Sequence, residues 1–425
     1  MTPPLMTRDA QAFIHQAGST PAMAAVTRAE GAYLWTEDGR QLLDFHGNNV
    51  HHIGYGHSRV KAAITTQMEA LPFAPRRFTC DPAVALAERL AALAPGDLNR
   101  VLFATGGSDA VEIALKIARA ATGCYKTLSF WDSFHGAGFG AAGVGGDGMF
   151  RSGPVGPLMP GDQHVAPFAC FRCPYGHSAP DSCGLTCAQM VRYVLEREGD
   201  IGAVIAEPAR AAPYIPPPGF WAEVRAACDD HGALLIFDEI PTGLGKTGRM
   251  FAFDHDRVEP DILVLGKALG GGILPLAAVV AREGLNVAPD HALGHYTHEK
   301  NPVMAAAGLA TLDVIADEYL VENAAAMGTY TMEHLAGLQA RHPQVGDIRG
   351  RGLLIGIELT HPGTRDPDPA LAGRVLDHCL AHGLSFKTTM GNILTWTPPL
   401  IVTRAQLDFA IARLDAALTA CVTVS

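Results

Sequence analysis

The chain has 425 residues, a formal net charge of −11 and a pI near 5.9. This acidic balance argues against general binding of nucleic acid or of anionic membranes. The first residues lack the basic-then-apolar pattern of a secretory signal, and no uninterrupted apolar run reaches membrane-spanning length. Nine cysteines, an odd number scattered along the chain, fit reduced thiols. We therefore expect a cytoplasmic protein whose partners include neither nucleic acid nor a membrane.

The first part of the chain predicts a hairpin followed by helices. Residues 31–45 contain two short strands around an Asp-Gly turn. Helical apolar spacing covers residues 59–68 and 81–93, and a short buried strand follows at 101–103.

The middle of the chain predicts a parallel sheet. A loop-rich stretch at 136–161 separates two groups of elements, and a helix is predicted at 220–231. Short apolar strands are predicted at 127–130, 202–206, 233–237 and 262–265. Strands separated by helices indicate an α/β fold, with a mainly parallel central sheet and helices on both faces.

Beyond residue 315 the pattern begins again with a helix, then a strand-like segment at 352–359 and helices at 369–381 and from 403 onward. We interpret residues 316–425 as a smaller α+β C-terminal domain and residues 59–315 as the large domain. Residues 1–58 are then an N-terminal segment that packs with the small domain.

Two neighbouring strand ends carry the candidate chemistry. One buried strand ends at Asp238, and the next leads through Gly266 to Lys267. Ligands of parallel sheets lie at the carboxyl ends of the strands. An aspartate facing a pyridine nitrogen keeps it protonated, and a desolvated lysine amine attacks an aldehyde. Either residue alone could be an ordinary turn residue, but the pair predicts a site for pyridoxal 5'-phosphate (PLP), with Ile240 on the same face as Asp238.

A phosphate site is predicted at Gly106-Gly107-Ser108, which precedes a helix with alanines and isoleucines on one face. Free backbone N–H groups and the helix dipole attract an anion there. Ser108 could equally be an ordinary N-cap.

Four cysteines lie close together in the sequence, at Cys170, Cys173, Cys183 and Cys187, with His177 between them. Their spacing is one that a structural zinc ion could use. Because packed thiols would have the same spacing, no metal is assigned.

The combined motifs resemble those of the class III aminotransferase family of fold type I PLP enzymes, from about residue 31 to the C-terminus. The matching segments are Gly54-Tyr55-Gly56-His57, Glu112-Ile113-Ala114-Leu115-Lys116, Phe134-His135-Gly136, Glu207-Pro208, Asp238-Glu239-Ile240, Pro260-Asp261, Gly266-Lys267-Ala268, Asn301-Pro302 and Pro398-Pro399-Leu400. This resemblance implies a homodimer with active sites built from both subunits.

The resemblance also implies roles for individual residues. Lys267 matches the lysine that forms the Schiff base with PLP, and Asp238 matches the partner of the pyridine nitrogen. The other matches to cofactor-binding residues are Phe134, which stacks on the ring opposite Ile240, His135 beside it, Gly107 and Ser108 at the phosphate, the acidic Glu207, and Thr297, whose counterpart reaches the phosphate across the dimer interface.

The departures from the family indicate the substrate. Where many relatives have an arginine that grips a substrate carboxylate, this chain has Thr395. Other motifs, among them Gly47-Asn48 and Pro75-Arg76-Arg77-Phe78-Thr79, are most similar to the ammonia-lyases of bacterial phosphonate catabolism. That branch implies release of ammonia from 2-amino-1-hydroxyethylphosphonate by β-elimination, which gives phosphonoacetaldehyde. Arg76 and Arg77 are the predicted phosphonate ligands, with Arg210 and Lys387 as alternatives.

Three other functions remain open at this stage. An ω-amine or amino-acid:2-oxo acid aminotransferase would need an oxo acid for sustained turnover. A racemase or epimerase would release no ammonia. A non-enzymatic PLP-binding protein would form no product from any amine.

Overall fold

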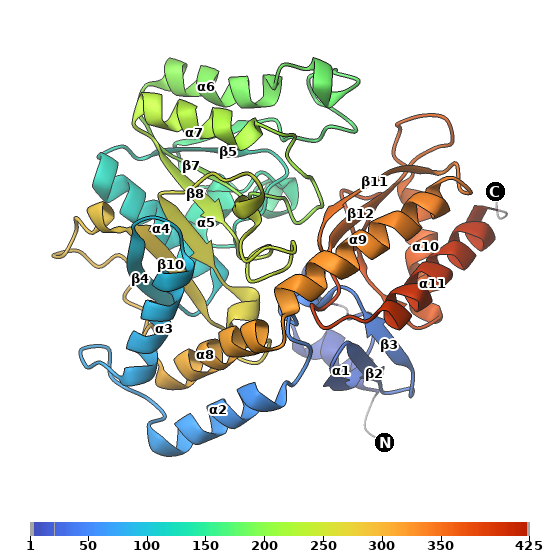
Figure 1. The fold of residues 1–425 in the computed structure, drawn as a ribbon, viewed down its shortest axis with the longest axis horizontal. Helices are drawn as coiled ribbons and strands as arrows, with labels where there is room; N and C mark the ends of the chain where they lie inside the picture. The colour runs from blue at the N-terminus through green and yellow to red at the C-terminus, as the bar shows by residue number, and fades with distance from the viewer. Residues whose placement is uncertain (1–3, 21, 423–425) are drawn as a thin grey trace.

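Seven strands form the central sheet of the structure, a computed structural model that describes residues 4–20 and 22–422. Their order is β4-β10-β9-β8-β7-β5-β6 (Figure 1). The bounds are β4 (Leu98–Ala104), β5 (Lys126–Phe130), β6 (Asp162–Val165), β7 (Ile201–Ala206), β8 (Leu234–Asp238), β9 (Ile262–Leu265) and β10 (Ala277–Arg282). Neighbouring strands from β6 to β9 are parallel, and β10 is antiparallel to β9 and β4. The prediction of an α/β fold with a mainly parallel sheet is confirmed.

Helices cover both faces of this sheet (Figure 1). Alternate strand residues point to opposite faces, so Ile236 and Val264 join the apolar cluster of α4, whereas Leu235 and Leu263 join that of α7. Both faces are buried, which is why the strands read as continuous apolar runs. The helices of this part are α2 (Ser58–Ala70), α3 (Asp81–Leu93), α4 (Gly107–Thr122), α5 (Phe139–Val144), α6 (Thr186–Glu198), α7 (Phe220–His231) and α8 (Pro302–Asp317).

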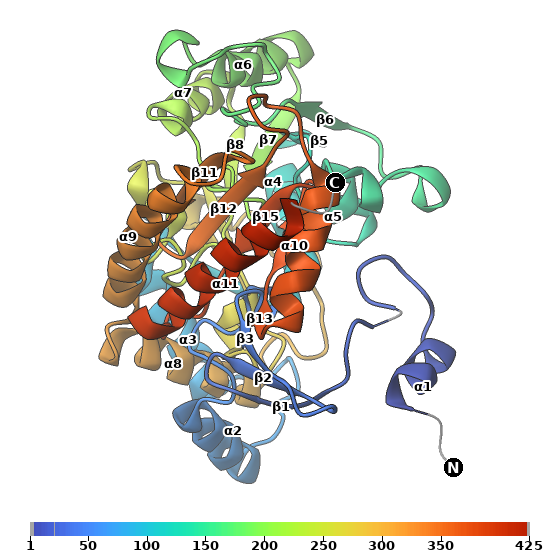
Figure 2. The same cartoon turned by 90° about the vertical axis from the view of Figure 1, so that its right-hand side faces the viewer.

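The C-terminal part contains a four-stranded antiparallel sheet with the order β11-β12-β15-β14. Its elements are α9 (Leu320–Gln339), β11 (Val345–Arg351), β12 (Leu354–Leu359), α10 (Pro369–Ala381), β14 (Lys387–Thr389), β15 (Ile393–Trp396) and α11 (Arg404–Val422). Figure 2 shows α10 and α11 packed side by side over this sheet.

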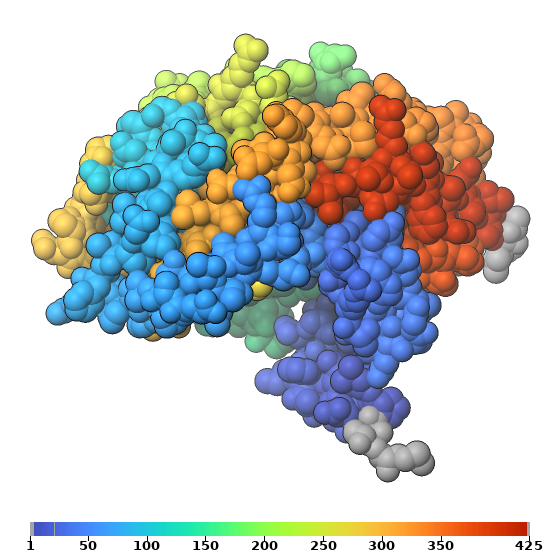
Figure 3. Space-filling model, turned by 60° about the horizontal axis from the view of Figure 1, so that its bottom comes forward, coloured from blue at the N-terminus to red at the C-terminus, as the bar shows by residue number. Residues whose placement is uncertain are grey.

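The N-terminal strands β1 (Val26–Glu30), β2 (Tyr33–Thr36) and β3 (Gln41–Asp44) form a sheet that is completed by β13 (Leu384–Ser385) from the C-terminal part. Leu43 pairs with Leu384 in this parallel contact. Helix α1 (Leu5–Ala12) buries no residue and projects from the body, as Figure 3 shows. No helix in the described part of the chain is long and apolar enough to cross a bilayer.

Several short elements were not predicted. The stretch at 136–161 contains α5 and short 3-10 turns, and the apolar strand β10 follows the glycine-rich segment at 270–272. Each is short enough that its conformation depends on neighbours in space. The division of the chain at residues 58 and 315 stays a proposal.

Candidate active site

The carboxyl ends of β7, β8 and β9 lie at one edge of the central sheet, where the N-terminus of α4 also lies. They border a cavity of about 590 Å³ that receives residues from the N-terminal, central and C-terminal parts of the chain. The side chains that line it are His46, Asn48, Asn49, Phe134, Asp147, Met149, Phe150, Glu207, Arg210, Ala211, Ala212, Pro241, Lys267, Lys387, Thr388, Thr389 and Met390, together with Gly391.

Lys267 lies in the wall of this cavity, two residues after β9. Its φ is 44°, a left-handed conformation that a residue other than glycine rarely adopts. Such strain is typical of sites where the surrounding structure fixes a reacting group. Burial lowers the pKa of its amine, while the charges of Asp238 and Glu207 oppose that shift. A partly desolvated amine of lowered pKa is suited to form an imine.

Asp238 lies at the end of β8 and is almost fully buried. One carboxylate oxygen accepts a hydrogen bond from the Ile240 backbone N–H at 3.0 Å. The other lies 2.7 Å from Nδ1 of the buried His135, so Nδ1 donates to the carboxylate. Each carboxylate oxygen retains a lone pair, and Asp238 can therefore accept a further hydrogen bond from a pyridine N–H.

The predicted phosphate loop forms the first turn of α4 and is packed tightly against its neighbours. A Cβ on Gly107 would lie 2.9 Å from the Ile240 side chain, and a Cβ on Gly136 would lie 2.5 Å from Oγ of Ser108. Oγ of Ser108 accepts a hydrogen bond from the Ala137 N–H at 3.0 Å. Gly107 thus leaves the backbone N–H groups accessible at the helix N-terminus, as an anion site requires.

The aromatic wall of the cavity is Phe134, which is 40% exposed and whose ring centroid lies 4.5 Å from that of Phe150. An exposed ring at the cavity surface is available to stack on a planar cofactor. Oε2 of Glu207 accepts a hydrogen bond from the Ala211 N–H at 2.7 Å, which holds this buried carboxylate against the loop after β7.

Position 395, where many relatives have an arginine, is a fully buried threonine on β15. Its hydroxyl lies 2.8 Å from that of Thr389 on the neighbouring strand. In the antiparallel register of β14 and β15, the residue directly opposite Thr395 is Lys387. The chain therefore has a cation on β14 across from the position where relatives place one on β15.

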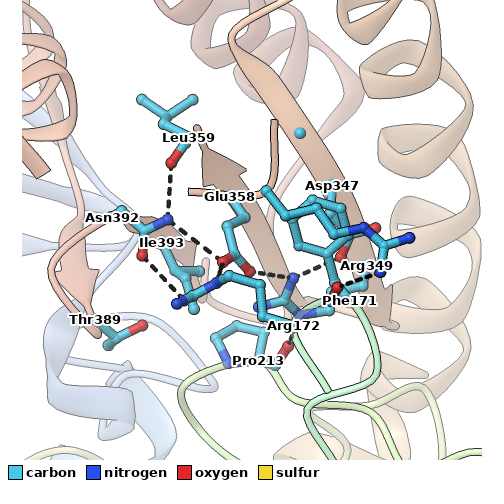
Figure 4. Close-up of polar contacts among 12 residues, drawn as sticks. Phe171, Arg172, Pro213, Asp347, Arg349, Glu358, Leu359, Thr389, Asn392 and Ile393 are labelled. Carbon is cyan, nitrogen blue, oxygen red and sulfur yellow. Dashed lines mark hydrogen bonds and ion pairs between the residues drawn. The ribbon is translucent and has the colours of Figure 1, made fainter. Parts of the chain in front are cut away.

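Next to the cavity, the C-terminal sheet is joined to the loop before α6 by a buried ion-pair network. Figure 4 shows the guanidinium groups of Arg172 and Arg349 converging on the carboxylate of Glu358. Arg349 also pairs with Asp347 at 2.5 Å, and Asn392 donates to the Leu359 carbonyl at 2.7 Å. We call Arg172, Arg349, Asp347 and Glu358 the junction network. Both of its arginines form ion pairs with carboxylates of the same network.

Three predicted site residues lie away from this cavity. Arg76 lines a separate cavity of about 550 Å³, where its Nη2 lies 2.6 Å from Nε2 of His295. Arg77 and Thr297 are exposed. The structure therefore brings Lys267 together with Asp238, but it does not bring Arg76, Arg77 or Thr297 to that cavity within one chain.

The cysteine cluster also has a defined place. Cys170, Cys173, Cys183 and Cys187 line a small apolar cavity of about 20 Å³ together with His177. Burial raises the pKa of the Cys187 thiol to about 12, which disfavours the thiolate that binds metal. Within residues 4–20 and 22–422, no group of three or more His, Cys, Asp or Glu side chains is placed to hold a metal ion.

The sequence did not predict that His46, Asn49 and Met390 line the cavity. All three come from segments outside the central sheet. Burial is the main cause that lowers the pKa of His46 to about 4, so its ring is neutral near pH 7. The Gly47-Asn48 pair was the nearest sequence indication, because it belongs to the motifs of the phosphonate branch.

A lysine and an aspartate at neighbouring carboxyl ends of a parallel sheet, with an anion site at the start of α4, define a PLP-dependent enzyme of fold type I. The chain belongs to the class III aminotransferases, whose family model matches residues 14–418.

The relatives include enzymes of different reaction types. An (R)-1-hydroxy-2-aminoethylphosphonate ammonia-lyase from Vibrio splendidus is 43% identical over 98% of this chain and 90% of the relative. An isoleucine 2-epimerase from Lentilactobacillus buchneri is 35% identical over 93% of this chain and 90% of the relative. The family therefore establishes a PLP-dependent enzyme but does not by itself fix the reaction.

Solved structures match closely. An omega-transaminase from Thermomicrobium roseum superposes with a TM-score of 0.92 at 30% identity, over 98% of both chains. A PLP-bound amine transaminase from an uncultivated Pseudomonas species has a TM-score of 0.90 at 32% identity, over 96% of this chain and 99% of that one. The cofactor is PLP, and the tight Gly107 turn, the available Asp238 oxygens and the buried Lys267 amine fit it.

Proposed function

We propose that this enzyme releases ammonia from 2-amino-1-hydroxyethylphosphonate and forms phosphonoacetaldehyde. The observation that carries the proposal is the threonine at position 395. It is fully buried and hydrogen-bonded to Thr389, so no guanidinium is available there to grip a carboxylate. An aminotransferase that cycles between amino acids and oxo acids needs such a grip. The 43% identity to the Vibrio splendidus ammonia-lyase supports the same reaction.

The residues of the cavity have distinct roles in this reaction. PLP, when bound, supplies an electron sink for the carbon that bears the substrate amine. Asp238 holds the proton on the pyridine nitrogen, and His135 orients the Asp238 carboxylate through its 2.7 Å hydrogen bond. The Lys267 amine removes a proton from the carbon that bears nitrogen. Loss of the neighbouring hydroxyl as water, followed by hydrolysis, gives the aldehyde and ammonia without an oxo acid.

The deciding experiment is incubation of the holoenzyme with each enantiomer of 2-amino-1-hydroxyethylphosphonate, with and without pyruvate. We expect ammonia and aldehyde in equal amounts in the absence of pyruvate. If pyruvate is required, and alanine forms with an aldehyde that keeps the hydroxyl and without free ammonia, the enzyme is an aminotransferase, a function that the transaminase structures favour. The amine-bearing carbon of this phosphonate is a CH2 with no configuration to invert, so an epimerase is tested separately: inversion of isoleucine at C2 without release of ammonia would identify one.

We also infer a homodimer. Thr297 is exposed and does not line the Lys267 cavity, although the resemblance places its counterpart at the cofactor phosphate. A second subunit would reconcile these positions. Sedimentation equilibrium of the holoenzyme tests this inference, and a monomer of 44.9 kDa would contradict it.

A further inference from the structure

Arg210 has an environment that is unusual for a buried guanidinium. The residue is 7% exposed and lies in the wall of the Lys267 cavity. Its Nη1 is 3.7 Å from the sulfur of Met390, its Nε has no hydrogen-bond partner among the described residues, and its ion pair with Glu207 is long, at 4.0 Å. A buried charge without strong acceptors is costly, which indicates that a ligand supplies them.

Lys387 is the second cation of this part of the cavity. It lies on β14, opposite Thr395, and its ammonium forms no hydrogen bond or ion pair with residues of the described chain. Side chains directly opposite each other in an antiparallel pair lie on the same face of the sheet. Lys387 therefore presents its charge on the face to which the arginine of relatives belongs.

The cavity wall carries three cations and two carboxylates, and this excess of positive charge favours an anion. Lys267, Lys387 and Arg210 contribute cations, and Glu207 and Asp147 are the carboxylates that line the same cavity. Each carboxylate already accepts a backbone hydrogen bond, Glu207 from Ala211 and Asp147 from Met149.

Arg349 of the junction network differs from Arg210 in its carboxylate partners. Arg349 and Arg210 both lie 5.2 Å from the Tyr214 ring, but Arg349 has two carboxylate partners within 2.7 Å. The cation with protein acceptors faces the domain junction, whereas the one without them faces the cavity.

We propose that Lys387 and Arg210 together bind the phosphonate group of the substrate, in place of the carboxylate-binding arginine of relatives. This assignment rests on the proposed function for the identity of the substrate. It replaces Arg76 and Arg77, of which Arg76 lies in the separate cavity with His295. A phosphonate has three oxygens, so it can accept hydrogen bonds from both cations at once.

The test uses the holoenzyme at saturating PLP and the variants Lys387→Met and Arg210→Gln. Two quantities are measured: KM for 2-amino-1-hydroxyethylphosphonate, and the dissociation constant of methylphosphonate by titration calorimetry. Methylphosphonate has no amine, so its binding does not depend on turnover. Lys61→Met and Arg249→Gln, both at exposed positions, are the matched controls. The visible absorption of the cofactor and the unfolding temperature identify variants that have lost PLP or the fold.

We expect each cavity variant to raise both constants by about 10- to 100-fold, the usual effect of losing a charge-assisted hydrogen bond, with kcat changed less than KM. The controls should stay within about 3-fold of the parent. The assignment is overturned if the folded, PLP-loaded variants bind methylphosphonate as the parent does, or if Arg76→Gln weakens binding and they do not. If the parent produces no ammonia, the proposed function fails, but the methylphosphonate titration still decides the assignment.

Discussion

The junction network and the Lys267 cavity are neighbours in space, but their cations differ in how closely carboxylates neutralise them. In the junction network, Arg172 and Arg349 share the buried carboxylate of Glu358, and Asp347 adds a second negative charge. In the cavity, Arg210 has Glu207 as its carboxylate partner at the longer distance of 4.0 Å, and Lys387 has no ion-pair partner among residues 4–20 and 22–422. A buried charge is stable only when an opposite charge neutralises it. Protein carboxylates do so in the junction network, where the arginines stabilise the structure, whereas in the cavity we propose that a bound anion does so.

The largest expected effect lies in the cavity. Lys267→Ala removes both the imine-forming amine and the base, and we expect turnover to fall by at least about 10⁴-fold. The visible absorption of the imine should disappear as well. Lys61→Ala is the control at an exposed position. Full turnover of the Lys267→Ala protein would remove the basis for the whole site.

A substitution in the junction network should lower the free energy of unfolding and leave the affinity for methylphosphonate nearly unchanged. Glu358→Gln leaves Arg349 with Asp347 as its remaining partner, and we expect the free energy of unfolding to fall by about 3 kcal/mol, near the low end for an uncompensated buried charge. Urea unfolding measures this, with the exposed Glu333→Gln as control. Methylphosphonate affinity should change by less than about 3-fold. A loss of affinity as large as that of Lys387→Met would erase the distinction between the two regions.

The pH dependence of binding sharpens the comparison. Burial, followed by the charge of Lys267, lowers the pKa of Lys387 to about 8, with Arg210 lowering it further and Glu207 opposing the shift. Below that pH the ammonium attracts a dianion, and above it the neutral amine does not. We therefore expect the dissociation constant of methylphosphonate to rise by up to about 10-fold from pH 7 to pH 9.

Other groups at the cavity constrain this interpretation. Burial, the largest cause, lowers the pKa of His46 to about 4, so its ring stays neutral over the range. The Lys387→Met variant should show a nearly flat profile in the same titration. A variant that keeps the slope of the parent would assign the transition to another group, such as Lys267.

The smallest expected effect concerns Lys246, a fully buried lysine that donates to the Pro398 carbonyl at 2.7 Å. Burial lowers its pKa to about 7. Between pH 7 and about 10 the unfolded chain therefore binds a proton that the native chain has lost, so this residue makes stability rise with pH. Relative to the parent, Lys246→Met should remove a slope of about 1 kcal/mol per pH unit. Urea unfolding at pH 7 and 9 measures it, and equal slopes would contradict the prediction.

The central sheet and its reactive ends were predictable because their information is local. A buried apolar strand followed by Asp238, and another followed by Gly266 and Lys267, indicate both the sheet and the edge where a ligand binds. The antiparallel β10 and the short α5 were missed, since each is too short to show a distinctive hydrophobic period.

Sequence alone indicated the family and the cofactor, and it predicted that Lys267 and Asp238 lie close together, because adjacent parallel strands end at the same edge of a sheet. Only the tertiary structure shows which cations line the Lys267 cavity. Arg76 and Arg77 were the predicted phosphonate ligands, with Arg210 and Lys387 as alternatives. Lys387 and Arg210 line the same cavity although they are far apart in the chain, whereas Arg76 lies beside His295 in another cavity. The register of β14 and β15 places Lys387 opposite Thr395. Such pairing depends on long-range packing, which no local pattern of residues records.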